Sequence, residues 1–294
     1  MKKQHFWGVL GLLAVTIIWG GGFTATDIAL RRYSPLQILT IRFLLGAVVM
    51  AFFARKEIKR IERPAWIAGS IMGFLLFSAF WLQTVAQVHT TASKNAFLTA
   101  TNVVMVPFIA WLVYKVKIGT HHLIGAVMTI AGVGLLSVKG GERLNPGDFY
   151  SIGCAVGFAL HIFFTGYFAK KNSAMALNLI QMTIACLLSL AMLVIRGETV
   201  VSLRNVEMLS VAYLGVFSTC LCFFLQTASQ KYTNETEAGI ILSMESVFGT
   251  LFSVWILGEH ITWKMMFGCL IILSAILISE FGQTIFERPK KEGM

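Results

Sequence analysis

Leu82-Gln-Thr-Val-Ala-Gln87 and Leu225-Gln-Thr-Ala-Ser-Gln230 are two copies of one sequence fragment. The shift that superposes them also places Asn102 on Glu245. The chain of 294 residues therefore contains two related halves, and each half is almost entirely apolar. A duplicated apolar sequence indicates two membrane-embedded repeats, with a binding site where the repeats meet.

The composition excludes a water-soluble domain. Only 13% of the residues are charged and 56% are hydrophobic, whereas a soluble domain has about 25% charged residues. The net charge of +10 comes from basic residues in short loops, which is typical of topology signals at a membrane surface and not of nucleic-acid binding. The five cysteines lie inside apolar segments without metal-ligand spacing, so we expect no disulfide, metal or cofactor.

Hydrophobic segments long enough to span a bilayer, which takes about 20 residues each, predict an all-α membrane protein. Its ten transmembrane helices form two inverted five-helix repeats. We expect repeats at 1–143 and 144–284 and a basic cytoplasmic tail at 285–294. The first apolar stretch is too long for a cleaved signal and is interpreted as a retained span. The predicted spans are 6–27, 35–54, 65–87, 92–114, 121–138, 148–169, 174–195, 207–229, 236–258 and 262–281.

Loop charges predict the orientation. With the N-terminus in the cytoplasm, fifteen Lys and Arg residues lie on the inner side and eight on the outer side. By the positive-inside rule, we expect a multi-pass membrane protein with both termini in the cytoplasm. The eight predicted outer residues are Arg31, Arg32, Lys94, Lys139, Arg143, Arg196, Arg204 and Lys264.

The odd number of spans in each half makes the second repeat enter the membrane from the opposite side. Two inverted halves can exchange conformations, closing one face of the membrane while opening the other. The sequence thus predicts a secondary transporter that works by alternating access through a central cavity.

Glu245 and Asn102 are the first candidates for the substrate or proton site. Each is placed about 14–15 Å deep by the helical rise, near the membrane midplane. An ionisable group at that depth costs at least about 2.5–3.5 kcal/mol unless it faces protein or water. The alternative is a structural role, in which Asn102 bonds between helices and Glu245 pairs with Arg42.

Arg42 lies inside the second span, seven residues after Pro35. It could bind a substrate carboxylate, or it could neutralise Glu245 permanently. Of these two roles, the structural ion pair is the slightly favoured interpretation because a free arginine inside a cavity is rarer than a paired one.

Asn95, Thr99 and Asn102 are spaced to share one helix face, and Ser243 with Glu245 stands opposite them in the second repeat. A polar stripe on two symmetry-related helices predicts a water-filled cavity between them. Small polar residues also support plain helix packing.

Further polar candidates lie elsewhere in the spans. The matched residues Gln83 and Gln226 are predicted at opposite mouths, where structural use is favoured over gating. His161 and Gln181 lie deep in the sixth and seventh spans, and a satisfied interhelical donor is favoured over a proton relay for His161. The run Trp19-Gly-Gly-Gly-Phe23 predicts a hinge or a close helix approach.

The chain resembles the ten-helix EamA group of the drug/metabolite transporter superfamily over residues 6–281. The resemblance rests on Trp19-Gly20, on Pro35 with Arg42-Phe43, and on Glu245-x-x-Phe248 followed by Leu257-Gly258-Glu259 and Gly268. It implies transport of amino acids, other metabolites or toxic compounds across the cell (inner) membrane, and a helix-end contact for Glu259. The family pattern has proline after this first glutamate, where the chain has Ser246, so the kink of the ninth helix is expected to be absent or displaced.

The leading hypothesis is therefore an exporter of small metabolites such as amino acids, either proton-coupled through Glu245 or a uniporter. One alternative is a multidrug or cation exporter driven by proton antiport, and another is an intramembrane enzyme. No constellation of catalytic residues or phosphate-binding loop supports the enzyme. The expected partners are a small-molecule substrate, protons and the lipid bilayer. A monomer is sufficient, although a dimer is possible.

Overall fold

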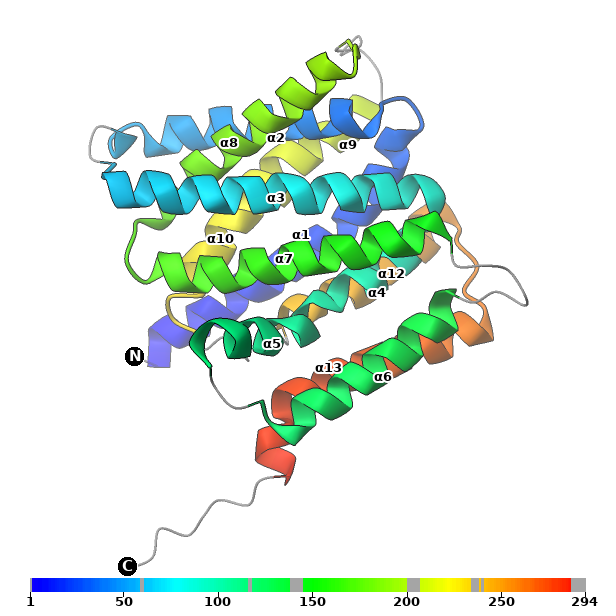
Figure 1. The fold of residues 1–294 in the computed structure, drawn as a ribbon. Helices are drawn as coiled ribbons and strands as arrows, with labels where there is room; N and C mark the ends of the chain where they lie inside the picture. Colours follow the sequence, from blue (N-terminus) through cyan, green and yellow to red (C-terminus); the bar gives the residue numbers. More distant parts are fainter. Residues whose placement is uncertain are drawn as a thin grey trace, which may run out of the picture.

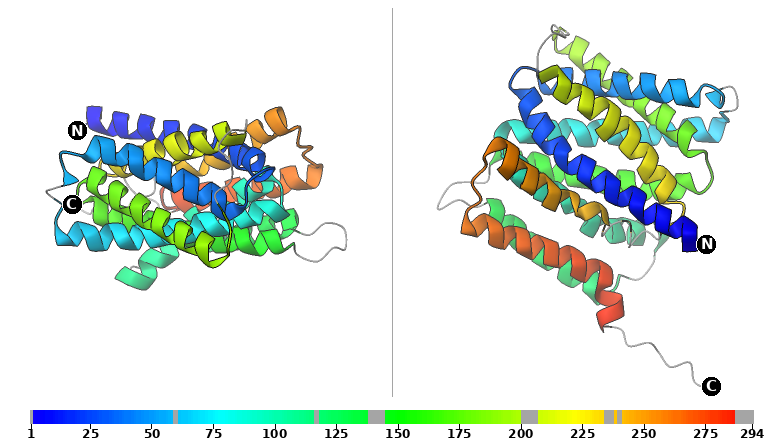
Figure 2. Two further views of the ribbon diagram at one scale, coloured as in Figure 1. Left: turned by 90° about the horizontal axis from the view of Figure 1, so that it is seen from above. Right: turned by 180° about the vertical axis from the view of Figure 1, so that it is seen from behind.

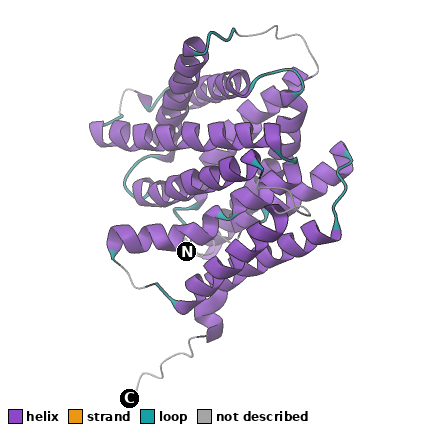
Figure 3. Ribbon diagram, turned by 45° about the vertical axis from the view of Figure 1, so that its right-hand side comes forward, coloured by secondary structure: helices purple, strands orange, loops and turns teal. Residues whose placement is uncertain are grey.

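The computed structural model describes residues 2–58, 61–115, 118–137, 145–199, 207–233, 238 and 241–286. Every regular element in these ranges is a helix (Figure 3). The helices are α1 (Lys2–Leu30), α2 (Pro35–Ala54), α3 (Arg63–His89), α4 (Ala92–Ala100), α5 (Asn102–Tyr114), α6 (Thr120–Ser137), α7 (Pro146–Ala169), α8 (Ala174–Ile195), α9 (Glu207–Tyr213), the π-helix η2 (Leu214–Leu221), α10 (Cys222–Ser229), α12 (Glu245–Phe252), the π-helix η3 (Ser253–Leu257) and α13 (Trp263–Phe286).

These helices make up ten apolar segments. Seven are long enough to cross a membrane, and three shorter ones cover Thr120–Leu135, Ile241–Leu257 and Trp263–Ser279. The protein is thus a ten-helix membrane protein, as predicted. The predicted start of the ninth span at 236, the repeat boundary at 143–144 and the tail from 287 onward lie outside the described residues. Helix α1 begins and α13 ends at the same end of the bundle (Figure 1).

The last helices of the two halves, α6 and α13, pack side by side (Figures 1 and 2). The repeat shift places Gly125 of α6 on Gly268 of α13. A Cβ atom at Gly125 would come within 2.8 Å of Ser279 Cβ and 2.9 Å of the Ala275 carbonyl oxygen. Small residues therefore let these two backbones approach closely, as is common between membrane helices.

The centre of the bundle is built from aromatic rings. The Phe80 ring makes edge contacts with Phe158 at 5.0 Å and Phe223 at 5.9 Å between centroids. Phe43 lies 5.8 Å from Phe80. These rings come from α2, α3, α7 and α10, so one aromatic cluster joins helices of both halves and borders the cavity described below.

The fourth and ninth spans are broken at matching positions. Thr101 separates α4 from α5 and Met244 precedes α12, and the repeat shift superposes these two residues. Their backbone angles are nearly identical, with φ −62° and ψ −13° at Thr101 and φ −62° and ψ −15° at Met244. Asn102 and Glu245 are thereby the first residues of the helices that follow.

Serine and threonine hydroxyls accompany both breaks. Thr101 Oγ1 donates to the Leu98 carbonyl oxygen at 2.7 Å, and Ser246 Oγ donates to the Ser243 carbonyl oxygen at 2.8 Å. Such bonds compete with the backbone ladder and bend helices. The ninth span is thus broken at Met244 although Ser246 stands where the family pattern has proline.

The glycines of the first span serve close packing. Helix α1 continues without interruption through Gly20, and a Cβ there would lie 2.5 Å from Phe248 Cβ and 2.8 Å from the Gly249 nitrogen. We therefore expect Gly20→Ala to destabilise the protein by about 1–3 kcal/mol through overpacking of α1 against α12.

Gly134 is the matched control, because a Cβ at this α6 position meets nothing within 4 Å. Gly134→Ala should be neutral or stabilising by up to about 1 kcal/mol. Thermal unfolding of the two variants in detergent checks the prediction. Equal unfolding midpoints would contradict the close approach of α1 and α12.

Candidate functional site

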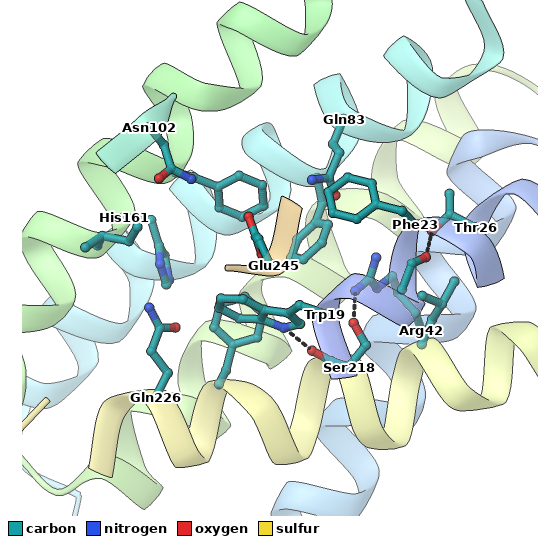
Figure 4. A pocket seen from close by; sticks show the side chains of 16 residues that line it. Trp19, Phe23, Thr26, Arg42, Gln83, Asn102, His161, Ser218, Gln226 and Glu245 are labelled. Atoms are coloured by element: carbon teal, nitrogen blue, oxygen red, sulfur yellow. Dashed lines mark hydrogen bonds between the residues drawn. The ribbon is translucent and has the colours of Figure 1, made fainter. Parts of the chain in front are cut away.

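A cavity of about 40 Å³ is lined by residues of both halves (Figure 4). That volume holds only a few water molecules. Five phenylalanine and tryptophan side chains form most of its apolar wall, and its polar groups come from eight helices, α1, α2, α3, α5, α7, η2, α10 and α12. The lining residues are Trp19, Gly22, Phe23, Thr26, Arg42, Phe80, Gln83, Asn102, Phe158, His161, Ile162, Leu214, Ser218, Phe223, Gln226 and Glu245.

Four pairs of lining residues are related by the repeat shift. They are Trp19 with Ile162, Phe80 with Phe223, Gln83 with Gln226, and Asn102 with Glu245. The cavity therefore lies where equivalent positions of the two halves converge. The two phenylalanines and the two glutamines preserve the symmetry, whereas the charges break it: Asn102 stands opposite Glu245, and the position equivalent to Arg42 is Ala185.

Arg42 is held by α2 and by the π-helix η2. Its Nε donates to Thr219 Oγ1 at 3.0 Å, and its Nη2 lies 3.5 Å from Ser218 Oγ. Its guanidinium carbon lies 3.9 Å from the centroid of the Phe80 ring, which is a close cation–π contact. The side chain is 1% exposed. Two hydroxyls and an aromatic face thus hold the cation at the cavity wall.

Glu245 and Arg42 line the same cavity but do not pair. Both residues are described, and their charged groups are not within the 4.0 Å of an ion pair. The prediction of a structural Arg42–Glu245 ion pair is therefore wrong. The reason is that Thr219 and Phe80 hold the guanidinium at its own wall, while Glu245 enters from the first turn of α12. Glu245 is buried and faces the cavity without a hydrogen-bond donor from the described residues.

Asn95 and Thr99 do not line the cavity, so the predicted polar stripe is only partly correct. Asn95 Nδ2 donates to the Gln83 carbonyl oxygen at 3.0 Å and to Gln87 Oε1 at 3.2 Å, and Ser151 Oγ donates to Asn95 Oδ1 at 2.9 Å. Thr99 is also buried among helices. These contacts join α3, α4 and α7. The break at Thr101 turns Asn102 into the cavity while its predicted companions serve helix packing.

Ser243, another residue of the predicted stripe, does not line the cavity either. It is buried, and its carbonyl oxygen accepts a hydrogen bond from the Ser246 hydroxyl.

His161 lines the cavity and is anchored by Gln181, which lies behind it. His161 Nε2 is 2.8 Å from Gln181 Oε1, and Thr165 Oγ1 is 3.5 Å from His161 Nδ1. Gln181 Nε2 donates to Asn178 Oδ1 at 2.6 Å, so the glutamine amide fixes the direction of the bond from the imidazole. Both ring nitrogens have protein partners, which agrees with the predicted satisfied interhelical contact.

Gln83 and Gln226 point into one cavity from opposite sides (Figure 4). The predicted placement at two separate mouths is wrong, because both glutamines line the same cavity, where Phe80 of α3 meets Phe223 of α10. Trp19 also lines the cavity, and its Nε1 donates to the Ser218 carbonyl oxygen at 2.8 Å.

One end of the bundle contains a buried ion pair that the sequence analysis missed. Lys94 Nζ lies 2.6 Å from Asp148 Oδ1, and both side chains are almost fully buried. Lys94 was predicted as a loop charge, but it belongs to the first turn of α4. The signal was present, since Thr91, a typical N-cap residue, stands three residues before Lys94, and Asp148 follows Pro146 at another helix start.

Glu259 contacts the start of α4 at the same end of the bundle. Its Oε1 accepts from the Ala92 backbone nitrogen at 2.9 Å, and its Oε2 accepts from that of Ser93 at 3.3 Å. A carboxylate at a helix N-terminus satisfies free amides and the helix dipole. The predicted helix-end contact of Glu259 is confirmed, and it connects the second half of the chain to the first.

The model of the EamA-like transporter family matches residues 6–138 and again residues 145–281. The chain belongs to the EamA-like transporter family. This family is part of the drug/metabolite transporter superfamily, so the resemblance found in the sequence is confirmed. Membership of the EamA family favours membrane transport over an intramembrane enzyme.

Relatives agree with the EamA assignment. An uncharacterized transporter of Archaeoglobus fulgidus is 32% identical over 275 residues, covering 94% of this chain and 86% of its own. An uncharacterized transporter of Clostridium kluyveri is 24% identical, with 83% of each chain covered. A solved crystal structure with 18% sequence identity has a TM-score of 0.72 and covers 96% of this chain and 99% of its own, which supports the fold.

Proposed function

We propose that this protein is an exporter of small zwitterionic metabolites such as amino acids, and that it moves them by alternating access through the central cavity. The observation that carries the proposal is the pair of opposite charges, Arg42 and Glu245, that share the cavity without forming an ion pair.

Buried charges without a counter-charge are unfavourable, and such groups inside membrane proteins usually mark a substrate or ion pathway. A zwitterion supplies both counter-charges: its carboxylate pairs with Arg42 and its ammonium with Glu245. Asn102, which starts α5 beside the cavity, provides a further amide. The carboxylate of an amino acid suits the planar guanidinium, which binds carboxylates through two parallel hydrogen bonds.

The aromatic walls also fit a cationic drug, which is the second candidate substrate class. Cations bind over aromatic faces, and Glu245 would attract them. However, the guanidinium of Arg42 already occupies the face of Phe80 at 3.9 Å. A second cation would meet this positive charge in a small apolar space, so a zwitterion fits the cavity better than a simple cation.

The small cavity volume supports alternating access. A space of about 40 Å³ is too small for an amino acid. The helices around it must therefore separate to admit substrate. The matching breaks at Thr101 and Met244 supply equivalent bending points in the two halves, next to Asn102 and Glu245. The proposal includes the predicted orientation, in which the protein spans the cell membrane with both termini in the cytoplasm.

Flux into liposomes tests the proposal. Purified protein is reconstituted, and uptake of radiolabelled phenylalanine, leucine and threonine is compared with uptake of phenethylamine and isoamylamine, with and without a pH gradient. We expect saturable uptake of the amino acids and little uptake of the amines. Uptake of the amines alone would support the cation exporter instead, and no uptake of any compound above that of empty liposomes would overturn the proposal.

Arg42→Gln gives the sharpest prediction on substrate class. Loss of the guanidinium should reduce amino-acid uptake by about 10-fold or more, because a hydrogen bond to a charged group contributes about 1.5–3 kcal/mol. Uptake of phenethylamine should rise relative to that of phenylalanine, since the positive charge beside Phe80 is gone. An unchanged ratio of the two uptakes would show that Arg42 does not bind the carboxylate. Arg31→Gln, at an exposed arginine, is the control.

A further inference from the structure

Among the described polar residues that line the cavity, Gln226 is the one whose side chain is fully buried and makes no hydrogen bond. It is 0% exposed, and neither its Nε2 nor its Oε1 has a partner. A buried amide without partners is unfavourable and rare in native structures. The side chain points into the cavity, on the side where His161 lies (Figure 4).

The repeat explains why this glutamine has no partner. The equivalent residue, Gln83, has Thr99 in reach, with 3.4 Å between Nε2 and Oγ1. The shift that places Gln83 on Gln226 places Thr99 on Leu242, which has no polar side-chain atom. The second half has therefore kept the glutamine and has no side-chain partner for it at this position.

Neighbouring groups do not replace that partner. Both nitrogens of His161 are engaged, by Gln181 and by Thr165. The next residue of α10, Thr227, donates to the Phe223 carbonyl oxygen and accepts from Asn178 Nδ2 at 3.1 Å, which holds this turn of the helix against α8. The Gln226 amide thus projects from a fixed backbone into the cavity.

We infer that Gln226 is a specificity-determining residue that hydrogen-bonds an uncharged polar group of the substrate. The inference rests on the proposed function and refines it: Arg42 and Glu245 bind the two charges, and Gln226 binds the side chain. Because its donor and its acceptor are both unused, the matching group is one that can accept and donate, such as a hydroxyl or a carboxamide. A site of this kind rejects an analogue that lacks the group, since the protein amide then stays unpaired.

Threonine and valine test the inference, because they differ by a hydroxyl in place of a methyl. Uptake of each by reconstituted wild-type protein is compared with uptake by Gln226→Met and by Gln87→Met, which changes a buried glutamine outside the cavity. Wild type should favour threonine. Gln226→Met should lower the threonine-to-valine uptake ratio by about 10-fold or more, and Gln87→Met should leave that ratio unchanged.

Thermal unfolding without substrate provides the second measurement. Gln226→Met removes an unpaired buried amide, so its unfolding midpoint should rise above that of wild type. Gln87→Met removes an amide that donates to the Phe23 carbonyl oxygen and accepts from Asn95 Nδ2, so it should not show this rise. A fall in the midpoint of Gln226→Met would show that the amide has a protein partner and would overturn the inference.

The outcomes separate this inference from the proposed function. If wild type transports both amino acids and Gln226→Met keeps the wild-type ratio, the inference fails while the proposed function stands. If wild type transports none of the amino acids, the proposed function fails and the inference falls with it.

Discussion

Glu245→Gln is expected to lower the uptake of zwitterionic amino acids by about 10- to 100-fold, because the substrate ammonium loses a charge-assisted hydrogen bond worth about 1.5–3 kcal/mol. Glu245 is the only acidic residue among those that line the cavity in the described part of the chain. The substitution preserves shape and removes only the charge. Uptake in proteoliposomes, with and without a pH gradient, measures the effect.

The same variant decides how transport is driven. If Glu245 carries the coupling proton, a pH gradient should accelerate uptake by wild type and have no effect on the residual uptake by Glu245→Gln. Asp27→Asn is the matched control, since Asp27 is a partly exposed acid at the surface of α1, paired with Arg31 at 3.6 Å. Equal uptake by wild type and Glu245→Gln would assign Glu245 a structural role and would contradict the zwitterion site.

The sequence predicted the spans well because membrane helices are long, apolar and separated by polar loops. The predicted spans 35–54, 174–195 and 207–229 agree with the helical segments of the structure. Hydropathy cannot show where a helix changes its backbone geometry. The π-helix η2 within the eighth span and the break at Thr101 within the fourth therefore came only from the structure.

The candidate site was predictable in its residues but not in its pairing. The repeat and membrane depth singled out Glu245 and Asn102, and both line the cavity. The partner of Arg42 was mispredicted because charge alone suggested Glu245. The actual partners, Thr219 and Phe80, depend on how η2 and α3 pack against α2. Neutral partners of a buried cation leave no pattern in one sequence, since serine, threonine and phenylalanine are common in every span.

Lys94 is a second residue whose role could not be predicted from the sequence alone. A lysine next to a loop looks like a topology signal, and only the start of α4 within the helix packing reveals that it is buried against Asp148. Removing Lys94 from the predicted loop charges strengthens the inner-side bias on which the predicted orientation rests.

Asp148→Asn is expected to destabilise the protein by about 3–5 kcal/mol, because it leaves the Lys94 ammonium buried without a counter-charge. The two side chains are only 9% and 2% exposed, and their charged atoms are 2.6 Å apart. The pair joins the first turns of α4 and α7, and α4 leads to the break beside Asn102. Unfolding in detergent, followed by denaturant or temperature, gives the loss of stability.

A double-mutant cycle shows whether the loss comes from the pair itself. Lys94→Met combined with Asp148→Asn removes both charges, and an apolar replacement of a buried pair is often neutral or stabilising. The double variant should therefore recover most of the stability that Asp148→Asn loses. The exposed pair of Arg31 and Asp27 is the reference, where Asp27→Asn should change stability by less than about 1 kcal/mol. If the two single losses simply add, Lys94 and Asp148 do not interact, and the buried ion pair is refuted.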